Sequence, residues 1–426
     1  MKKMLCAAQI GCGKFAHQQD LPNLSTHPLV HLKYACDVNI DNARATAEEF
    51  KIPCYTADFM DVINDPEVDF IKIATSHEAH LPIIEAAAKA GKHIFCEKPM
   101  AMYDEEAYKI IRAVRRGKVK ICVDLNRRMS PAMQALKKQY LAHAANPQHN
   151  PWQYVETVRE MLPEENLPHL NIRIQDESSS YGLGHLDPLT GGGEIIGESV
   201  HWIDLACWLF APQLPCEITA WGSSRLSHGI YLKFDGGASM TLDFSCSGTF
   251  DYPKEQFELT HNAAFFRSLH FVENEYYGFP GAGKESFALQ HDPYPEMGDG
   301  FENFKAKYFA KVQNSTNSKL IENTTPLTVD KGHRAMLDGF IDAILNDKPS
   351  PCDEMAGFRS TYLARLAIQS IRTKQTLPVQ IEDITPLHLL IKGDCSWGRG
   401  KLFFTRKKVF PFPRPQPFSK KAGYGW

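Results

Sequence analysis

Short apolar runs alternate with amphipathic stretches along the first 125 residues. Continuous apolar runs such as Met4–Ile10 and Phe70–Ala74 predict short strands that are buried on both faces of a sheet. Between them, Ala-rich stretches such as Asn42–Phe50 and Ile83–Ala90 have the spacing of helices. Further predicted elements are the strands His31–Cys36, His93–Cys96 and Val119–Leu125 and the helix Glu105–Arg115. Strands that alternate with helices in this way predict βαβ units and a parallel sheet.

The pattern changes near residue 126. Residues 146–190 are polar and rich in Pro and Asn, which predicts long loops with one or two strands. Beyond them, apolar residues recur at every second position, so we expect a mainly antiparallel sheet. Its predicted strands are Glu217–Ser223, Gly229–Phe234, Ala238–Ser245, Gln256–Thr260 and Phe265–Val272. The predicted helices are Ser130–His143, 194–210, Asp330–Leu345 and Phe358–Arg372.

The composition of the 426-residue chain is that of an ordinary globular protein, with 43% apolar and 23% charged residues. Its net charge of -3 argues against nucleic acid as a partner. No apolar run is long enough to cross a membrane, so we expect no membrane partner. The 11 Cys residues show no C-x-x-C pair and no regular spacing, which favours reduced thiols and a cytoplasmic location.

The last part of the sequence differs from the rest. Residues 385–426 hold nine Lys and Arg residues against one Asp, together with many aromatic residues. We interpret residues 381–426 as a basic, aromatic arm that packs on the body of the protein or on a neighbouring subunit. Nucleic acid or lipid binding is the alternative interpretation.

A glycine-rich loop follows the first predicted strand. Residues Ile10–Ala16 read I-G-C-G-K-F-A, which is the G-x-G-x-x-A pattern between a strand and a helix. In this pattern Gly11 allows a tight turn, Gly13 lets the backbone approach a pyrophosphate, and Ala16 permits close helix–strand packing. We assign to the cofactor the loop residues Gly11, Gly13, Lys14, Phe15 and Ala16. Asp37 ends the second strand, where an acid holds ribose hydroxyls and repels a 2′-phosphate, so the sequence favours NAD over NADP.

Four further motifs carry a family resemblance. They are Thr75–His80 (TSHEAH), Glu97–Pro99 (EKP), Asn126–Pro131 (NRRMSP) and Gly191–Leu205 (GGGEIIGESVHWIDL). In order and spacing, and together with the glycine loop, they resemble the glucose–fructose oxidoreductase, inositol dehydrogenase and rhizopine catabolism (Gfo/Idh/MocA) family. The resemblance covers roughly residues 4–380.

The resemblance implies an α/β fold in two parts. Residues 1–125 would form an N-terminal Rossmann domain that binds NAD(P). Residues 126–380 would form a C-terminal α+β domain with a large, open, mainly antiparallel sheet for substrate binding and oligomerisation. Nicotinamide would lie at the carboxyl ends of the parallel strands, and the open sheet would build a homodimer or homotetramer.

Three residues are the candidates for catalysis. Lys98 matches the family's E-K-P lysine, which points at the substrate hydroxyl and the nicotinamide ribose. His201 matches the family's catalytic histidine, and an imidazole can take an alcohol proton as hydride leaves. Many family members carry Asp four residues before this histidine, whereas this chain has Gly197 there and Glu198 one residue later. We expect Glu198 to partner His201 one helical turn away. The structural alternatives are a surface lysine and a core histidine.

The resemblance also suggests binding residues. Near the cofactor it places Thr75, Ser76, His77, His80, Glu97 and Lys98. Near the substrate we consider Arg127, Arg128, His185, Asp187 and Tyr181. An interdomain salt bridge is an equal alternative for the arginines, surface packing is one for Tyr181, and we interpret Asp204 as structural. We predict no metal site, because the sequence has no H-E-x-x-H motif, Cys quartet or acidic calcium loop.

Together these residues predict an NAD-dependent oxidoreductase. It would transfer a hydride between nicotinamide and a carbinol carbon of a sugar or glycoside, with C3 as the candidate carbon. One alternative is a glycoside hydrolase that oxidises C3 transiently, eliminates the aglycone, adds water and returns the hydride from tightly bound NADH. The second alternative is a non-catalytic NAD-binding sensor.

Overall fold

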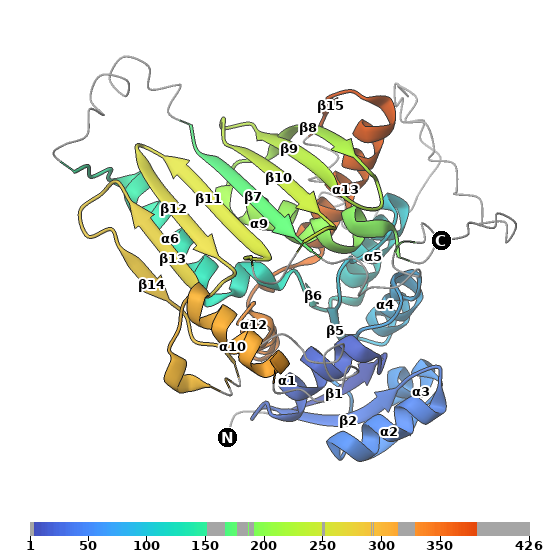
Figure 1. Ribbon diagram of the computed structural model, residues 1–426. Helices are drawn as coiled ribbons and strands as arrows, with labels where there is room; N and C mark the ends of the chain where they lie inside the picture. The colour runs from blue at the N-terminus through green and yellow to red at the C-terminus, as the bar shows by residue number, and fades with distance from the viewer. Residues whose placement is uncertain are drawn as a thin grey trace, which may run out of the picture.

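Two β-sheets form the framework of the molecule. The computed structural model describes residues 4–150, 167–176, 186, 191–248, 252–290, 292, 294–313 and 329–380. Within these ranges the chain builds one sheet of six strands and one of nine (Figure 1). Each sheet has its own helices, which pack on it.

The six-stranded sheet is parallel and comes from the N-terminal part of the chain. Its strands are β1 (Leu5–Ile10), β2 (Val30–Cys36), β3 (Cys54–Thr56), β4 (Phe70–Ile73), β5 (His93–Cys96) and β6 (Ile121–Val123). Their order is β3-β2-β1-β4-β5-β6, so the winding direction reverses between β1 and β4. This is the doubly wound dinucleotide fold, in which ligands bind beyond the carboxyl ends of the strands at the point of reversal.

The helices on this sheet come from two distant parts of the sequence. After β1 a π-helical segment, Ala16–Asp20, leads into α1 (Leu21–Ser25), and the next helices are α2 (Ile40–Phe50), α3 (Phe59–Asn64), α4 (His80–Lys89) and α5 (Asp104–Gly117). Helix α12 (His333–Leu345) joins them from far along the chain. Its Phe340 ring lies 5.7 Å from the Phe70 ring of β4 and 5.5 Å from the Phe95 ring of β5. Residues well past position 125 therefore help to complete the core around the first sheet.

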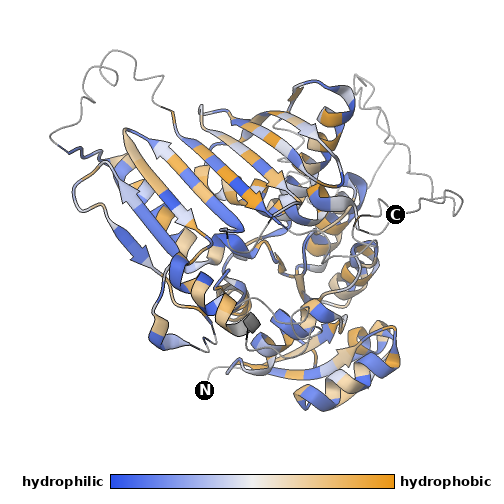
Figure 2. Ribbon diagram, viewed as in Figure 1, coloured by the Kyte–Doolittle hydropathy of each residue, from blue (hydrophilic) through white to orange (hydrophobic). Residues whose placement is uncertain are grey.

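The nine-stranded sheet is antiparallel except at one pair. Its strands are β7 (His169–Gln175), β8 (Pro215–Gly222), β9 (His228–Phe234), β10 (Ser239–Ser245), β11 (Glu255–His261), β12 (Ala264–Leu269), β13 (Glu273–Tyr277), β14 (Lys284–Ser286) and β15 (Leu377–Pro378). Their order is β14-β13-β12-β11-β7-β10-β9-β8-β15, and only β7 and β10 run parallel. Hydrophilic and hydrophobic residues alternate along several of these strands (Figure 2), as expected for a sheet with one buried face.

Three long helices cover one face of this sheet. Helices α6 (Pro131–Ala145), α9 (Val200–Phe210) and α13 (Glu354–Thr373) lie behind it in Figure 1. A second π-helical segment, Ile195–Ser199, leads directly into α9. Helix α10 (Phe301–Gln313) lies near the β14 edge (Figure 1).

The predicted fold class is confirmed: a Rossmann-like parallel sheet is followed by a second, mainly antiparallel sheet. Strand β7 falls in the stretch where one or two strands were expected. The sequence analysis did not predict β3, α3, β13, β14, α10 and β15. In the described ranges, no helix combines the length and the apolar character needed to cross a bilayer. The predicted arm, residues 381–426, lies outside the described residues.

Candidate active site

The glycine loop after β1 is shaped for a close ligand. Gly11 has a φ of +92°, and a Cβ atom there would lie 2.3 Å from the carbonyl oxygen of Ala74, so only glycine fits. Gly13 is exposed, and a Cβ atom at this position would meet nothing within 4 Å. The loop is thus packed against β4 on one side and open at Gly13 on the other. That arrangement suits a backbone that a pyrophosphate approaches.

Asp37 lies beside this loop at the end of β2. Its Oδ2 atom accepts a hydrogen bond from the backbone N–H of Cys12 (2.9 Å), and its Oδ1 atom accepts one from Asn39 (2.9 Å). A carboxylate has about four acceptor positions, so two remain for ribose hydroxyls. The loop and Asp37 therefore fit the adenosine end of a dinucleotide, which these residues would hold.

The turn that carries Lys98 is fixed on both sides. The Lys98–Pro99 peptide is cis. On one side the Glu97 carboxylate accepts a hydrogen bond from the buried Lys72 ammonium at 2.6 Å. On the other side Nδ1 of His80 lies 2.9 Å from the carbonyl oxygen of Pro99 and donates to it. Burial lowers the pKa of His80 to about 4, so this histidine is a neutral support of the turn at physiological pH.

Lys98 reaches across to the second π-helical segment. Its Nζ atom donates to the carbonyl oxygen of Gly197 and to Oε1 of Glu198, both at 2.6 Å. The Lys98 side chain is 15% exposed and that of Glu198 is 8% exposed. We expected Glu198 to partner His201, and the structure pairs it with Lys98 instead. The physical reason is that the π-helical backbone departs from the i, i+3 spacing of an α-helix on which the expectation depended.

His201 lies at the start of α9 and is only 2% exposed. Its Nε2 atom lies 2.9 Å from Nη1 of Arg127. A guanidinium can only donate, so Nε2 accepts and the ring is neutral with its proton on Nδ1. Burial lowers the pKa of His201 well below its ordinary value, and the charges of Arg127 and Lys98 lower it further. Within the described part of the chain, Nδ1 has no hydrogen-bond partner.

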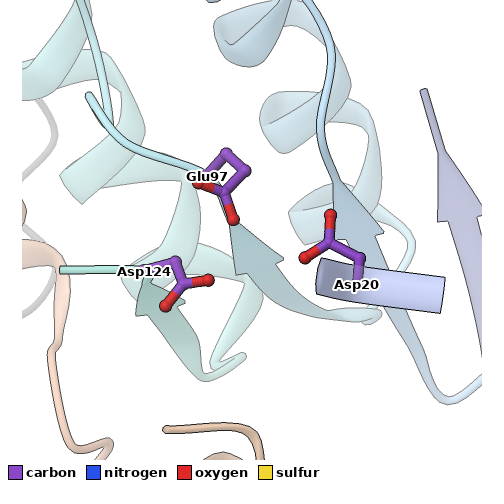
Figure 3. A group of neighbouring side chains, drawn as sticks. All are labelled: Asp20, Glu97 and Asp124. Atoms are coloured by element: carbon purple, nitrogen blue, oxygen red, sulfur yellow. The ribbon is translucent and has the colours of Figure 1, made fainter. Parts of the chain in front are cut away.

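A cluster of buried charges lies beneath the Lys98 turn. The carboxyl groups of Asp20, Glu97 and Asp124 come from the first π-helical segment and from the ends of β5 and β6, and they point toward one another (Figure 3). Nζ of Lys72 lies among them, at 3.1, 2.6 and 3.2 Å respectively. Three carboxyl groups at this spacing could hold a metal ion, but the Lys72 ammonium already supplies the positive charge. We name this group of four residues the Lys72 cluster.

One ammonium cannot balance three ionised carboxylates in a buried position. Burial raises the pKa of Asp20 to about 7 and that of Glu97 well above its usual range. Although burial acts in the same direction on Asp124, Lys72 and His333 keep the Asp124 pKa below its ordinary value. Of the three carboxyl groups, Asp124 is therefore the one whose ionised form the site favours, whereas burial disfavours the ionised forms of Asp20 and Glu97.

Arg128 supports the junction between the two sheets. Its guanidinium binds the Asp204 carboxylate through two nitrogens, with Nε at 2.9 Å from Oδ2, and Nη1 donates to the carbonyl oxygen of Pro351 (3.0 Å). Both side chains are buried. The structure thus pairs Arg128 with Asp204 inside the second domain, where an interdomain salt bridge or a substrate contact was expected, and Asp204 has a buried ion-pair partner.

The remaining predicted residues divide into two groups. Thr75 and Ser76 follow β4 at partly or fully exposed positions, and Nδ1 of His77 lies 3.1 Å from the carbonyl oxygen of Gly191. The second group, Tyr181, His185 and Asp187, lies outside the described residues. The Phe15 ring packs edge-on against His333 at 5.8 Å.

The sequence interpretation missed the residues behind the site. One signal for them was present: Lys72 lies in the middle of the apolar run FIKIA of a predicted buried strand. A charged side chain there needs buried partners of opposite charge. Nothing local in the sequence identifies those partners, because Asp20, Glu97 and Asp124 come from three separate segments.

The N-terminal domain matches a known family. Residues 6–125 match the Gfo/Idh/MocA model, which describes an oxidoreductase family with an NAD-binding Rossmann fold. Over these residues the chain is similar to the Gfo/Idh/MocA oxidoreductases. Its curated relatives include the uncharacterized oxidoreductase YrbE of Bacillus subtilis, which is 24% identical over 395 residues that span 90% of this chain and 98% of YrbE. Levoglucosan dehydrogenase of Pseudarthrobacter phenanthrenivorans is 37% identical over 113 residues, or 26% of this chain and 29% of that enzyme.

Two solved structures share the fold over most of this chain. An oxidoreductase from Agrobacterium radiobacter in complex with NAD+, L-tartaric acid and magnesium has a TM-score of 0.69 at 18% identity, covering 90% of this chain and 100% of that one. A levoglucosan dehydrogenase in complex with NADH and L-sorbose has a TM-score of 0.68 at 18% identity, covering 89% and 99%. At this level of identity the likeness establishes the shared fold.

Proposed function

We propose that this oxidoreductase is an NAD-dependent dehydrogenase of a sugar or glycoside, which transfers a hydride between nicotinamide and a ring carbinol carbon. The observation that carries the proposal is the hydrogen-bonded contact of Lys98 with the second π-helical segment, Ile195–Ser199. Lys98 follows β5 of the parallel sheet, whereas Gly197 and Glu198 precede α9 of the other domain, and Nζ of Lys98 bonds to both. A proton-carrying group is thus held between the domains, where the fold binds its ligand.

The residues present suit this reaction. When bound, the nicotinamide ring accepts or supplies the hydride. The Lys98 ammonium has three N–H donors; Gly197 and Glu198 take two, and one remains for a substrate oxygen. In the oxidative direction the hydroxyl proton would pass to Nζ of Lys98, and the neighbouring Glu198 carboxylate could take the proton that the ammonium must first release. His201, three residues beyond Glu198, would contact the same oxygen.

NAD is proposed over NADP because the Asp37 carboxylate lies beside the glycine loop. Its negative charge suits ribose hydroxyls and opposes a 2′-phosphate. The names of the relatives support a sugar or polyol as substrate, since they include levoglucosan dehydrogenase, D-apiose dehydrogenase and inositol 2-dehydrogenase. C3 as the reacting carbon, and a homodimer or homotetramer as the assembly, stay predictions.

Purification without added cofactor, followed by mass spectrometry of the released nucleotide, tests the cofactor. The loaded protein is then incubated with a panel of free sugars, polyols and aryl glycosides, and NADH formation and aglycone release are followed together. We expect NADH in equal amount to an oxidised sugar. Aglycone release without net NADH would instead support the redox-assisted hydrolase. A protein that binds neither NAD nor NADP would contradict the proposal.

A further inference from the structure

We propose that Arg127 is a positioning residue that holds His201 as a hydrogen-bond donor toward the reacting oxygen and prevents it from serving as the base. The inference rests on the proposed function only for the identity of that oxygen. The state of the His201 ring itself can be measured without any substrate. This role differs from the substrate contact and the salt bridge that we considered for Arg127 from the sequence.

The first step of the argument is the direction of one hydrogen bond. Nη1 of Arg127 lies 2.9 Å from Nε2 of His201, and both side chains are buried. Because a guanidinium has no acceptor and does not lose its proton in proteins, the imidazole lone pair at Nε2 must accept. A second proton on the ring would place two N–H groups against each other. The Arg127 contact therefore keeps His201 neutral, with its proton on Nδ1.

The second step is that Arg127 cannot easily turn away. Nη1 also donates to Oδ1 of Asn126 (2.9 Å), and Nη2 lies 3.4 Å from Oε1 of Glu255. The guanidinium lies 5.2 Å from the centre of the Trp202 ring. Glu255 is fully buried, and although burial opposes it, Lys331 and Arg127 lower the pKa of Glu255 to about 2. An ionised carboxylate thus remains in place to hold Arg127 over a wide pH range.

The third step fixes Asn126, which has no exposed surface. Its Nδ2 atom donates to the carbonyl oxygen of Lys331 (2.9 Å) and lies 3.0 Å from Nε2 of His333. The amide can satisfy both neighbours only in this orientation, which turns Oδ1 toward Arg127. His333 must then accept at Nε2 and carry its proton on Nδ1, which lies 3.3 Å from Oδ2 of Asp124.

These hydrogen bonds form one continuous series from the Lys72 cluster to His201. Asp124 accepts from Lys72 and from His333, and each later member has a single possible direction of donation. The series ends at Nδ1–H of His201, a buried donor without a partner in the described residues. A buried donor without an acceptor costs about 1–3 kcal/mol, so a ligand oxygen is the natural partner. Proton transfer is consequently left to Lys98 and Glu198.

Nuclear magnetic resonance of the full-length protein with 15N-labelled histidine tests the inference. The His201 signals are assigned by their loss in His201→Gln. Three further variants are compared: Arg127→Met removes the donor, Arg127→Lys keeps a charged group that only donates, and Arg173→Met makes the same change at an arginine with a half-exposed side chain. The spectra are recorded from about pH 8 to about pH 5 without substrate, a range that spans the ordinary histidine pKa.

In the wild type, Arg127→Lys and Arg173→Met we expect a His201 ring that carries its proton on Nδ1 and does not titrate. In Arg127→Met we expect a mixture of tautomers or a ring that becomes protonated within this range. With a substrate identified, kcat of Arg127→Met should fall on the order of 10²-fold with little change in KM, and Arg127→Lys should recover most of it.

A wild-type ring with its proton on Nε2, or one that is protonated near neutral pH, would overturn the inference. So would an Arg127→Met ring that behaves like the wild type. If Arg127→Met does not fold, the wild-type spectrum still tests the tautomer that the inference requires, and a ring with its proton on Nε2 still overturns it. A correct tautomer in a protein without dehydrogenase activity would contradict the proposed function alone.

Discussion

At the scale of single residues, the site depends on which hydrogen-bonding capacity each side chain has left. Asp37 binds two backbone N–H groups and keeps two acceptor positions. Lys98 binds Gly197 and Glu198 and keeps one donor. Residue types and approximate positions of this kind could be predicted from the sequence. The partner of Glu198 could not, because the choice between His201 and Lys98 depends on the π-helical backbone.

Asp37→Ser should weaken NADH binding by roughly 10- to 100-fold, since a charged hydrogen bond contributes about 1.5–3 kcal/mol. The affinity for NADPH should fall less, because the substitution also removes the charge that repels the 2′-phosphate. The ratio of the two Kd values should therefore become smaller. Fluorescence titration of both reduced nucleotides measures the two Kd values. Asp41→Ser, on the exposed side of α2, is the control and should leave both unchanged. A wild type that binds NADPH as tightly as NADH would contradict the assigned role.

At the scale of elements, periodicity predicted the strands and helices that have one buried face. The elements that were not predicted show where prediction from periodicity fails. Strand β14 has three exposed residues, so it shows no alternation of apolar and polar positions. Helix α12 was expected as an amphipathic helix, but nothing in its sequence indicates that it packs on the first sheet. The Lys72 cluster likewise unites segments whose contact only the folded chain reveals.

The cluster predicts a specific pH dependence of stability. The pKa of Asp20 is raised to about 7 from an ordinary value of 3.8, so the folded state holds a proton that the unfolded state lacks between these values. This contribution is complete below about pH 4 and is lost as the pH rises through about 7.

Asp20→Asn cannot titrate at this position. Relative to the wild type, it should therefore gain about 2 kcal/mol in the free energy of unfolding between about pH 5.5 and about pH 8. Urea unfolding of both proteins at the two pH values measures the difference. A difference between the two proteins that does not change with pH, or that changes in the opposite direction, would show that folded Asp20 does not titrate near pH 7.

At the scale of the whole molecule, the two sheets are joined by buried polar contacts near the site. Lys98 of the first domain binds the segment that leads into α9, and within the second domain Arg128 binds Asp204. The parallel sheet followed by the mainly antiparallel sheet could be predicted from local patterns, and the likeness of the N-terminal part to the Gfo/Idh/MocA family from motifs. The contact of Lys98 with Glu198 between the domains could not, because it joins residues that are 100 positions apart in the sequence.

Arg128→Met should lower the free energy of unfolding by about 3–5 kcal/mol, because it leaves the Asp204 carboxylate buried without its partner. The double variant Arg128→Met/Asp204→Leu should recover much of that loss, since it removes both charges. Chemical denaturation of the two single variants, the double variant and the wild type completes the cycle. If the double variant loses the sum of the two single-variant losses in the free energy of unfolding, the two residues do not act as a pair.

The central claim is that Lys98 handles the proton of the reacting oxygen between the two domains. The most direct measurement compares wild type and Lys98→Met on the same sugar, with NADH formation and NAD affinity determined in the same preparations. The account predicts NAD affinity within about threefold of the wild type and a kcat lower by roughly 10²- to 10⁴-fold. Lys98→Met that binds NAD normally and turns over at the wild-type rate would contradict the account.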